Sequence, residues 1–240
     1  MTILWVGGPA AAGKTTVSRL FARMHGYIWY SVDAHAFTHE ARAIEAGLHQ
    51  PDTGPGTFDR TPMILEDIRA FPANAPVIVE GAFVTPTMAG TARNALWLMP
   101  SKPEQQARLE VRNPGINHEG LIWGWQLIHD QLSGTQATIL TVDNQSIPQT
   151  LAAVEQHFAP FLTTNPDTPT RQSYLRLSNT ELATQSRQPT TTFDCECGTP
   201  TCTASVETSP ADLPSGRPLL APPHTTRARQ PNPPTEVHGG

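Results

Sequence analysis

The sequence predicts an α/β domain with three layers, in which a five-stranded parallel sheet is covered by helices on both faces. Two observations support this prediction. Short apolar runs alternate along the chain with longer segments whose apolar residues recur at helical spacing. Most of the apolar runs are also followed by glycine or an acidic residue, as strands are when each is followed by a helix that crosses back over the sheet.

Five apolar runs are expected to be the strands of this sheet. They are residues Ile3–Val6, Tyr27–Val32, Pro76–Val79, Ala95–Met99 and Thr138–Val142. Each run is short and dominated by aliphatic and aromatic side chains, as in a strand that is buried on both faces.

Helical patterns follow the first, fourth and fifth of these runs. The first helix is expected to end at Gly26, because glycine readily adopts the left-handed conformation of a C-cap. Ser101 and Ser146 each stand three residues before a Glu or Gln, which is the capping-box pattern that opens a helix. A further helix is expected from Thr170 to about Arg187.

The chain is expected to contain three parts. Residues 1–165 form the α/β domain, residues 166–188 a helical extension, and residues 189–240 a tail rich in Pro, Thr, Ser and Gly. No aromatic residue follows Phe193. Such a composition buries little apolar area, so we expect the tail to be largely irregular and mostly disordered.

Charge and composition exclude several classes of protein. The formal net charge is −5 and the isoelectric point is near 6.0, so no basic surface for nucleic acid is expected. The first residues lack the charged start and long apolar core of a signal peptide, and no run is long enough to span a membrane. We therefore expect a soluble, cytoplasmic protein.

The stretch GGPAAAGKTT, residues 7–16, matches the phosphate-loop pattern G-x-x-x-x-G-K-[ST] between an expected strand and an expected helix. Glycines let successive backbone amides turn toward one point, where they form an anion-binding nest at the positive end of the helix. The residues expected to contact the nucleotide are Gly8, Pro9, Ala10, Ala11, Ala12, Gly13, Lys14, Thr15 and Thr16.

Two side chains of this stretch have chemical roles. Lys14 is one of only two lysines in the chain, and its ammonium group is expected to contact the β- and γ-phosphates. The hydroxyl of Thr15 is expected to be a ligand of Mg²⁺. An Ala/Gly-rich turn without a ligand is the alternative interpretation.

Two acidic residues follow expected strands, and ligands of a parallel sheet bind at the carboxyl ends of its strands. Asp33 could accept a proton from a substrate hydroxyl or hold Mg²⁺ through water; the alternative is a helix N-cap. Glu80 could hold Mg²⁺ through water; the alternative is a structural ion pair. For Asp143 we favour a turn or cap role.

Phosphoryl transfer needs positive charge over the migrating group. Arg108 and Arg112 lie on one face of the helix after the fourth strand and are the candidates for this charge, since no lysine or arginine occurs between Arg112 and Arg171. The alternative is a solvated helix face paired with acidic neighbours. Residues 113–134 could act as a lid. Arg60 is a candidate contact for the substrate.

Three aromatic or imidazole side chains are weaker candidates. His35 lies two residues past Asp33 and is expected to be an exposed loop histidine rather than a base. Trp123 and Trp125 are expected to fill the core under the lid rather than to stack on a ligand.

Taken together, these segments resemble the P-loop small-molecule kinases, a group that includes shikimate kinase, chloramphenicol phosphotransferase and zeta-toxin kinases. The similar segments are GGPAAAGKTT, YSVDAH, VIVEG and RLEVR, within residues 1–162. The resemblance implies a P-loop NTPase fold with sheet order 2-3-1-4-5 and ATP with Mg²⁺ as phosphoryl donor. It also implies that Asp33 acts on the acceptor hydroxyl and that Arg108 and Arg112 belong to a lid.

The tail segment FDCECGTPTC is similar to a cysteine segment appended to various bacterial regulatory and uncharacterised proteins, in which a histidine often follows. The three cysteines of the chain and one histidine would then be candidate zinc ligands: Cys195, Cys197, Cys202 and His224. The alternative is a tail without metal. An odd number of cysteines points away from a disulfide framework.

Two hypotheses follow for the function. The first is an ATP-dependent kinase that phosphorylates a hydroxyl of a small molecule. The second is a nucleotide-binding switch with little catalysis, in which the cysteine tail binds a metal or a protein partner.

Overall fold

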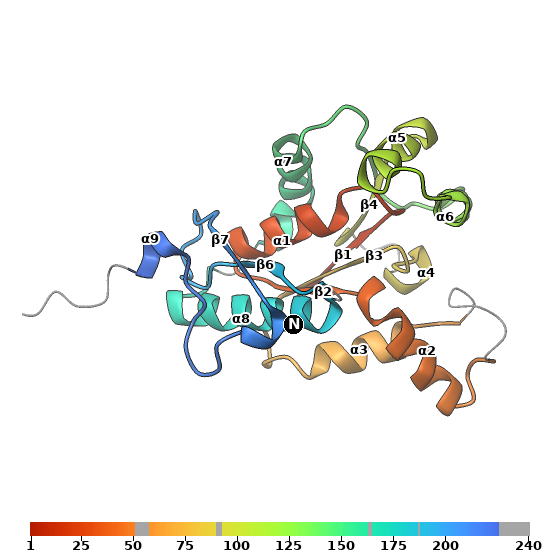
Figure 1. Ribbon diagram of the computed structural model, residues 1–240. Helices are drawn as coiled ribbons and strands as arrows, with labels where there is room; N and C mark the ends of the chain where they lie inside the picture. Colours follow the sequence, from red (N-terminus) through yellow and green to blue (C-terminus); the bar gives the residue numbers. More distant parts are fainter. Residues whose placement is uncertain (51–57, 90–92, 163–164, 187, 226–240) are drawn as a thin grey trace, which may run out of the picture.

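The computed structural model describes residues 1–50, 58–89, 93–162, 165–186 and 188–225 (Figure 1). Its central feature is a five-stranded parallel sheet with strand order β2-β3-β1-β4-β5. This order is the 2-3-1-4-5 order expected from the resemblance, so the predicted fold class is confirmed.

The strands of this sheet lie within one or two residues of the predicted positions. They are β1 Ile3–Gly7, β2 Ile28–Ser31, β3 Val77–Gly81, β4 Ala95–Met99 and β5 Ile139–Thr141. A separate two-stranded antiparallel sheet contains β6 Thr191–Asp194 and β7 Ser205–Thr208.

The helices fill the intervals between the strands. The α-helices are α1 Lys14–His25, α2 Ala36–Glu45, α3 Thr61–Arg69, α4 Pro86–Ala89, α5 Lys102–Arg112, α6 Glu119–Leu132, α7 Ile147–Phe158, α8 Thr168–Gln185 and α9 Pro222–Thr225. Three short 3-10 turns are η1 Asp33–His35, η2 Ala159–Phe161 and η3 Pro210–Asp212. Gly26 ends α1 in the left-handed conformation, and Ser146 opens α7 with a complete capping box, as predicted.

Two apolar layers enclose the sheet because successive side chains of each strand point to opposite faces. Leu4 and Val6 of β1 pack with α1 and α7, whereas Trp5 packs with α3 and α6 on the other face. In Figure 1, α1 and α7 accordingly lie on one side of the sheet and α3 on the other. This sandwich brings the N-terminus of α1 to the carboxyl end of β1.

Helix α8 covers the edge of the sheet at β2. The hydroxyl of Ser178 in α8 accepts a hydrogen bond of 3.0 Å from the backbone N–H of Trp29 in β2. This contact satisfies an N–H group that an edge strand leaves unpaired. The helix predicted for this region therefore also covers the edge of the sheet at β2.

The described residues of the tail, 188–225, lack regular secondary structure over much of their length, as predicted. They pack on α1 and α8. Ion pairs contribute to this packing: Asp194 pairs with Arg19 and Arg23 of α1, and Glu196 pairs with Arg176 of α8. An expectation based only on the content of apolar residues does not include the contribution of such ion pairs.

Within the described part of the chain, none of the helices has the length and apolar character needed to cross a membrane.

Candidate functional site

The loop between β1 and α1 contains three residues with positive φ. Gly8 has φ 135° and Gly13 has φ 87°, values that side chains with a Cβ atom rarely adopt. A Cβ atom at Gly8 would also stand 2.2 Å from the carbonyl oxygen of Leu98. Ala11 is left-handed as well, with φ 62°. The loop thus requires both glycines and holds one alanine in an unfavourable conformation.

The side chain of Lys14 lies within this loop. It is 6% exposed, and its Nζ atom donates a hydrogen bond of 2.9 Å to the carbonyl oxygen of Pro9. The same atom lies 3.9 Å from a carboxylate oxygen of Asp33. The only other lysine, Lys102, begins α5 and lies beside Trp125. The buried ammonium group therefore has partners from both the loop and the end of β2.

Glu80 and Thr15 meet beside Lys14. Glu80 is fully buried, and its Oε1 atom accepts a hydrogen bond of 3.1 Å from the Thr15 hydroxyl. Its Oε2 atom has no hydrogen-bond partner among the described residues. Burial raises the pKa of Glu80 to about 7, because the nearby charge of Lys14 offsets the loss of solvation only in part. A buried carboxylate oxygen without a partner next to a threonine hydroxyl suits a hydrated divalent cation.

Of the charged side chains Lys14, Asp33 and Glu80 at the carboxyl end of the sheet, that of Asp33 is the most exposed. Its Oδ1 atom accepts a hydrogen bond of 2.6 Å from the backbone N–H of Ala82, just after β3, and its carboxylate group is 39% exposed. It does not cap the helical turn that it begins. The structure thus places Asp33 with Lys14 and the end of β3, and not in the cap role considered as the alternative.

Arg108 is at the loop, whereas Arg112 is not in contact with it. The guanidinium group of Arg108 donates hydrogen bonds to the carbonyl oxygens of Val142 (2.7 Å) and Ala11 (3.4 Å). Its Nε atom pairs with Glu104, one turn earlier in α5. Arg112 is exposed at the end of α5. Of the two arginines, only Arg108 has a structural link to the phosphate loop.

Arg60 is a buried cation on which the charge of Asp33 acts. It is 2% exposed, and its guanidinium carbon lies 4.1 Å from the ring centroid of Phe58 and 4.2 Å from that of Phe83. Its Nε and Nη2 atoms have no hydrogen-bond partner among the described residues. Burial lowers the pKa of Arg60, and the charges of Glu40 and Asp33 oppose this effect.

Of the weaker candidates, Trp125 and His35 have contacts within the fold, whereas Trp123 is exposed. The Nε1 atom of Trp125 donates to the carbonyl oxygen of Pro100, and the ring packs against the core, as predicted; Trp123 differs and is exposed. His35 is not an exposed loop residue: its Nε2 atom lies 2.5 Å from Glu181 of α8. Burial would lower the pKa of His35, but the hydrogen bond and charge of Glu181 raise it.

Other contacts at the site were not predicted from the sequence. Gln105 is fully buried in α5, and its amide nitrogen donates to the carbonyl oxygens of Ala10 (3.1 Å) and Leu121 (3.3 Å). It therefore joins the phosphate loop to α6, the segment expected to be a lid. Asp143 accepts a hydrogen bond of 2.6 Å from the N–H of Ser101, which links the loop after β5 to the start of α5, whereas the N-cap of α7 is Ser146.

The sheet order, the glycine-rich loop before α1 and the Thr15–Glu80 pair define the class of the domain as a P-loop NTPase fold. The 2-3-1-4-5 order, with Asp33 at the end of β2, is the arrangement that the resemblance to small-molecule kinases implied. No protein-family model matches the chain, and no curated protein matches it.

Solved structures with a similar fold include three kinases. A gluconokinase from Sinorhizobium meliloti 1021 is 16% identical with a TM-score of 0.46, over 67% of this chain and 93% of that one. A sugar kinase from Janibacter sp. HTCC2649 is 17% identical with a TM-score of 0.49, over 69% of this chain and 99% of that one. Shikimate kinase from Acinetobacter baumannii is 19% identical with a TM-score of 0.41, over 69% of this chain and 96% of that one. The assignment of the class rests on the chain's own strand order and loop.

Proposed function

We propose that the protein is an ATP-dependent phosphotransferase that moves the γ-phosphoryl group of ATP to a hydroxyl group of a small molecule, with Mg²⁺. One observation carries the proposal: the partly exposed carboxylate group of Asp33 lies 3.9 Å from the Lys14 ammonium group. A protein that only binds nucleotide has no need of a solvent-accessible acid beside the γ-phosphate position. A kinase needs one for the acceptor hydroxyl.

The donor would be bound by the loop and the start of α1. Backbone amides of residues 8–16 and the helix dipole favour the phosphate charges, and Lys14 would exchange its contact with Pro9 for the β- and γ-phosphates. Thr15 and Glu80 fit Mg²⁺, because one buried carboxylate oxygen of Glu80 has no hydrogen-bond partner among the residues that the structure describes. When bound, the ion would neutralise charge on the phosphate oxygens.

The acceptor would lie between Asp33 and Arg60. In the proposed step the acceptor oxygen forms a bond to the γ-phosphorus and the bond to the β-phosphate oxygen breaks, so that ADP leaves. The acceptor's hydroxyl proton passes to the carboxylate group of Asp33. Two nitrogen atoms of Arg60 have no hydrogen-bond partner among the described residues, and together with the aromatic neighbours of Arg60 they favour an acceptor that also carries an anionic or strongly polar group.

Arg108 is proposed to position the phosphate loop through Ala11 rather than to contact the migrating group directly. Its guanidinium group already binds two carbonyl oxygens and Glu104. For Arg112 we propose contact with the donor only after residues 113–134 move toward the loop, since it begins from an exposed position at the end of α5.

The test is the variant Asp33→Asn, compared with Asp130→Asn at an exposed position of α6. A screen of small hydroxylated molecules with labelled ATP first identifies an acceptor. Asp33→Asn should then retain ATP affinity within about threefold and lose at least about 100-fold in kcat, whereas Asp130→Asn should match the parent. Equal rates in all three proteins would disprove the role of Asp33. Tight nucleotide binding without acceptor-stimulated ADP release would indicate a switch instead.

A further inference from the structure

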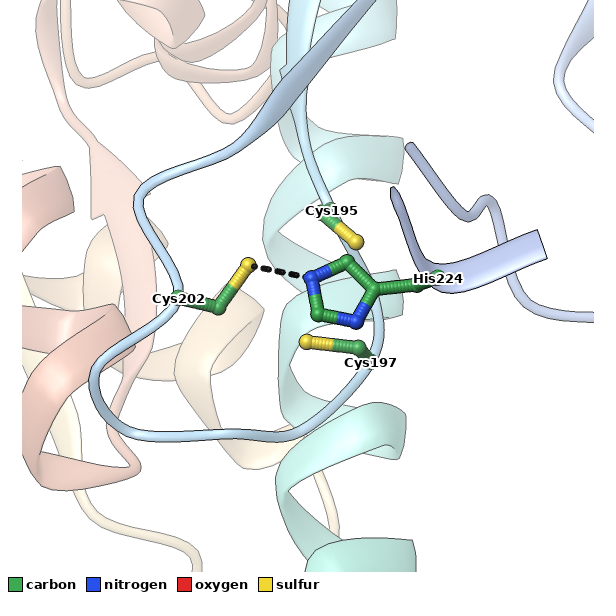
Figure 2. A group of neighbouring side chains, drawn as sticks. All are labelled: Cys195, Cys197, Cys202 and His224. Atoms are coloured by element: carbon green, nitrogen blue, oxygen red, sulfur yellow. Dashed lines mark hydrogen bonds between the residues drawn. The ribbon is translucent and has the colours of Figure 1, made fainter. Parts of the chain in front are cut away.

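The three cysteines and His224 form one cluster at the end of the described chain. One ligand atom of each residue lies within 4.8 Å of those of the other three. The Sγ atom of Cys202 is 3.4 Å from Nε2 of His224. Figure 2 shows the imidazole ring of His224 lying among the three thiol groups, which come from the turn after β6 and from the segment before β7.

The size and chemistry of this cluster fit one tetrahedral metal ion. Zinc–sulfur bonds of about 2.3 Å imply sulfur atoms about 3.8 Å apart, so atoms within 4.8 Å of one another need to move by only about 1 Å. Three sulfur donors and one imidazole nitrogen are a ligand set typical of structural zinc. Cys195 is fully buried and Cys202 is 8% exposed, so the site is closed on most sides.

Backbone groups around the sulfur atoms support metal binding. The N–H of Ala221 donates to the Sγ atom of Cys195 at 3.3 Å, and the N–H of Thr199 donates to that of Cys197 at 3.5 Å. Such donors favour sulfur that carries the negative charge of a metal-bound thiolate. Gly198 has φ 74°, and a Cβ atom there would lie 2.7 Å from the carbonyl oxygen of Thr168. The turn that brings Cys195 and Cys197 together thus requires glycine.

The residues that alternate with these cysteines attach the segment to the domain. Asp194 pairs with Arg19 and Arg23 of α1 at 3.0 and 3.1 Å. Glu196 is fully buried and accepts a hydrogen bond of 2.9 Å from Asn179 of α8. In the sequence Asp-Cys-Glu-Cys, the two acidic side chains therefore contact the helices, while the two thiols belong to the cluster.

We propose that Cys195, Cys197, Cys202 and His224 bind one Zn²⁺ ion, which fixes residues 188–225 on α1 and α8. Binding replaces the protons of the three thiols, which pass to solvent, and leaves His224 neutral with Nε2 on the metal. The metal site would be structural, because all four coordination positions are occupied by side chains of this chain. The proposal does not depend on the phosphotransferase activity.

The experiment measures metal in the intact, tag-free chain purified under reducing conditions. Atomic spectroscopy should find about one zinc per chain in the parent, and less than about 0.2 in Cys197→Ser and in His224→Asn. His129→Asn, at a histidine of α6 that is half exposed and remote from the cluster, is the matched control and should keep its zinc. Addition of a strong chelator should increase the rate of reaction of the thiols with a colorimetric reagent at least about tenfold.

A second measurement on the parent chain alone covers the case in which the variants do not fold. Co²⁺ added to the zinc-free protein should give the sulfur-to-metal charge-transfer band and the intense visible bands of a tetrahedral site, and Zn²⁺ should displace them. The proposal is overturned if the parent binds no Co²⁺ or Zn²⁺ stoichiometrically, if both variants keep the metal, or if the cysteines are found in a disulfide. None of these outcomes bears on ATP binding.

Discussion

Replacement of Glu80 by glutamine should stabilise the protein at alkaline pH while impairing its activity. The carboxyl group of Glu80 is fully buried at the end of β3. One of its oxygens is bound to Thr15, and the other has no hydrogen-bond partner in the part of the chain that the structure describes. Burial raises its pKa from 4.5 to about 7. Glutamine has nearly the same shape and carries no charge, so Glu80→Gln removes the titration while leaving the packing in place.

The expected change in the free energy of unfolding follows from the pKa of Glu80. The folded protein holds the Glu80 proton more tightly than the unfolded chain, so the proton stabilises the fold fully below about pH 4.5. This contribution is lost as the pH rises toward about 7. A shift of this size corresponds to about 3 kcal/mol. Between pH 5 and pH 8, the unfolding free energy of the parent should therefore fall by about 2–3 kcal/mol relative to that of Glu80→Gln.

The assay is urea unfolding at pH 5 and pH 8, without nucleotide or magnesium and with constant ionic strength. The matched control is Glu45→Gln, at an exposed position that ends α2. It should change the free energy of unfolding by less than about 0.5 kcal/mol at either pH. In the presence of ATP, added magnesium should raise the melting temperature of the parent and have a much smaller effect on Glu80→Gln.

Parallel pH profiles for the parent and Glu80→Gln would refute this reasoning. They would mean that Glu80 ionises normally in the folded protein, and hence that the polar groups around it, Lys14 and Thr15 among them, compensate fully for its burial.

Three further predictions concern the free energy of unfolding, measured in urea. Ala11→Gly should stabilise the nucleotide-free protein by about 0.5–1 kcal/mol, because glycine adopts the φ of 62° without strain; an unchanged midpoint would contradict this. Asp194→Asn should destabilise it by about 2–3 kcal/mol, since two arginines of α1 lose their charged partner; a loss below about 0.5 kcal/mol would argue against these ion pairs. Gly26→Ala should destabilise more than Gly47→Ala. Both glycines have φ 69°, but only at Gly26 would the Cβ atom approach Pro166, to 2.6 Å; equal losses would exclude this clash.

The sheet and the donor side of the site were predictable because their sequence signals are local. Strand positions follow from short apolar runs, and the phosphate loop requires glycine at Gly8 and Gly13 for reasons of backbone geometry. Asp33 and Glu80 could be placed near the loop because the carboxyl ends of parallel strands meet at one edge of a sheet. The resemblance supplied the strand order.

The parts that were not predicted depend on contacts between distant segments. His35 was expected to be exposed because nothing near it in sequence indicates Glu181, which approaches from α8. Gln105 gives no signal, because a glutamine in a helix is usually a surface residue. The packing of the tail was missed for the same reason: Asp194 finds its partners about 170 positions earlier in the chain.

The pairing of α1 with Asp194 has a consequence for protein synthesis. The helix that follows the phosphate loop emerges from the ribosome early, and β5 completes the central sheet well before Asp194 is made. Until then the guanidinium group of Arg23, 6% exposed in the finished fold, has no carboxylate to neutralise it. The nascent domain should therefore reach its final stability only when the last fifth of the polypeptide has been translated, and a chain terminated at residue 188 should remain prone to proteolysis.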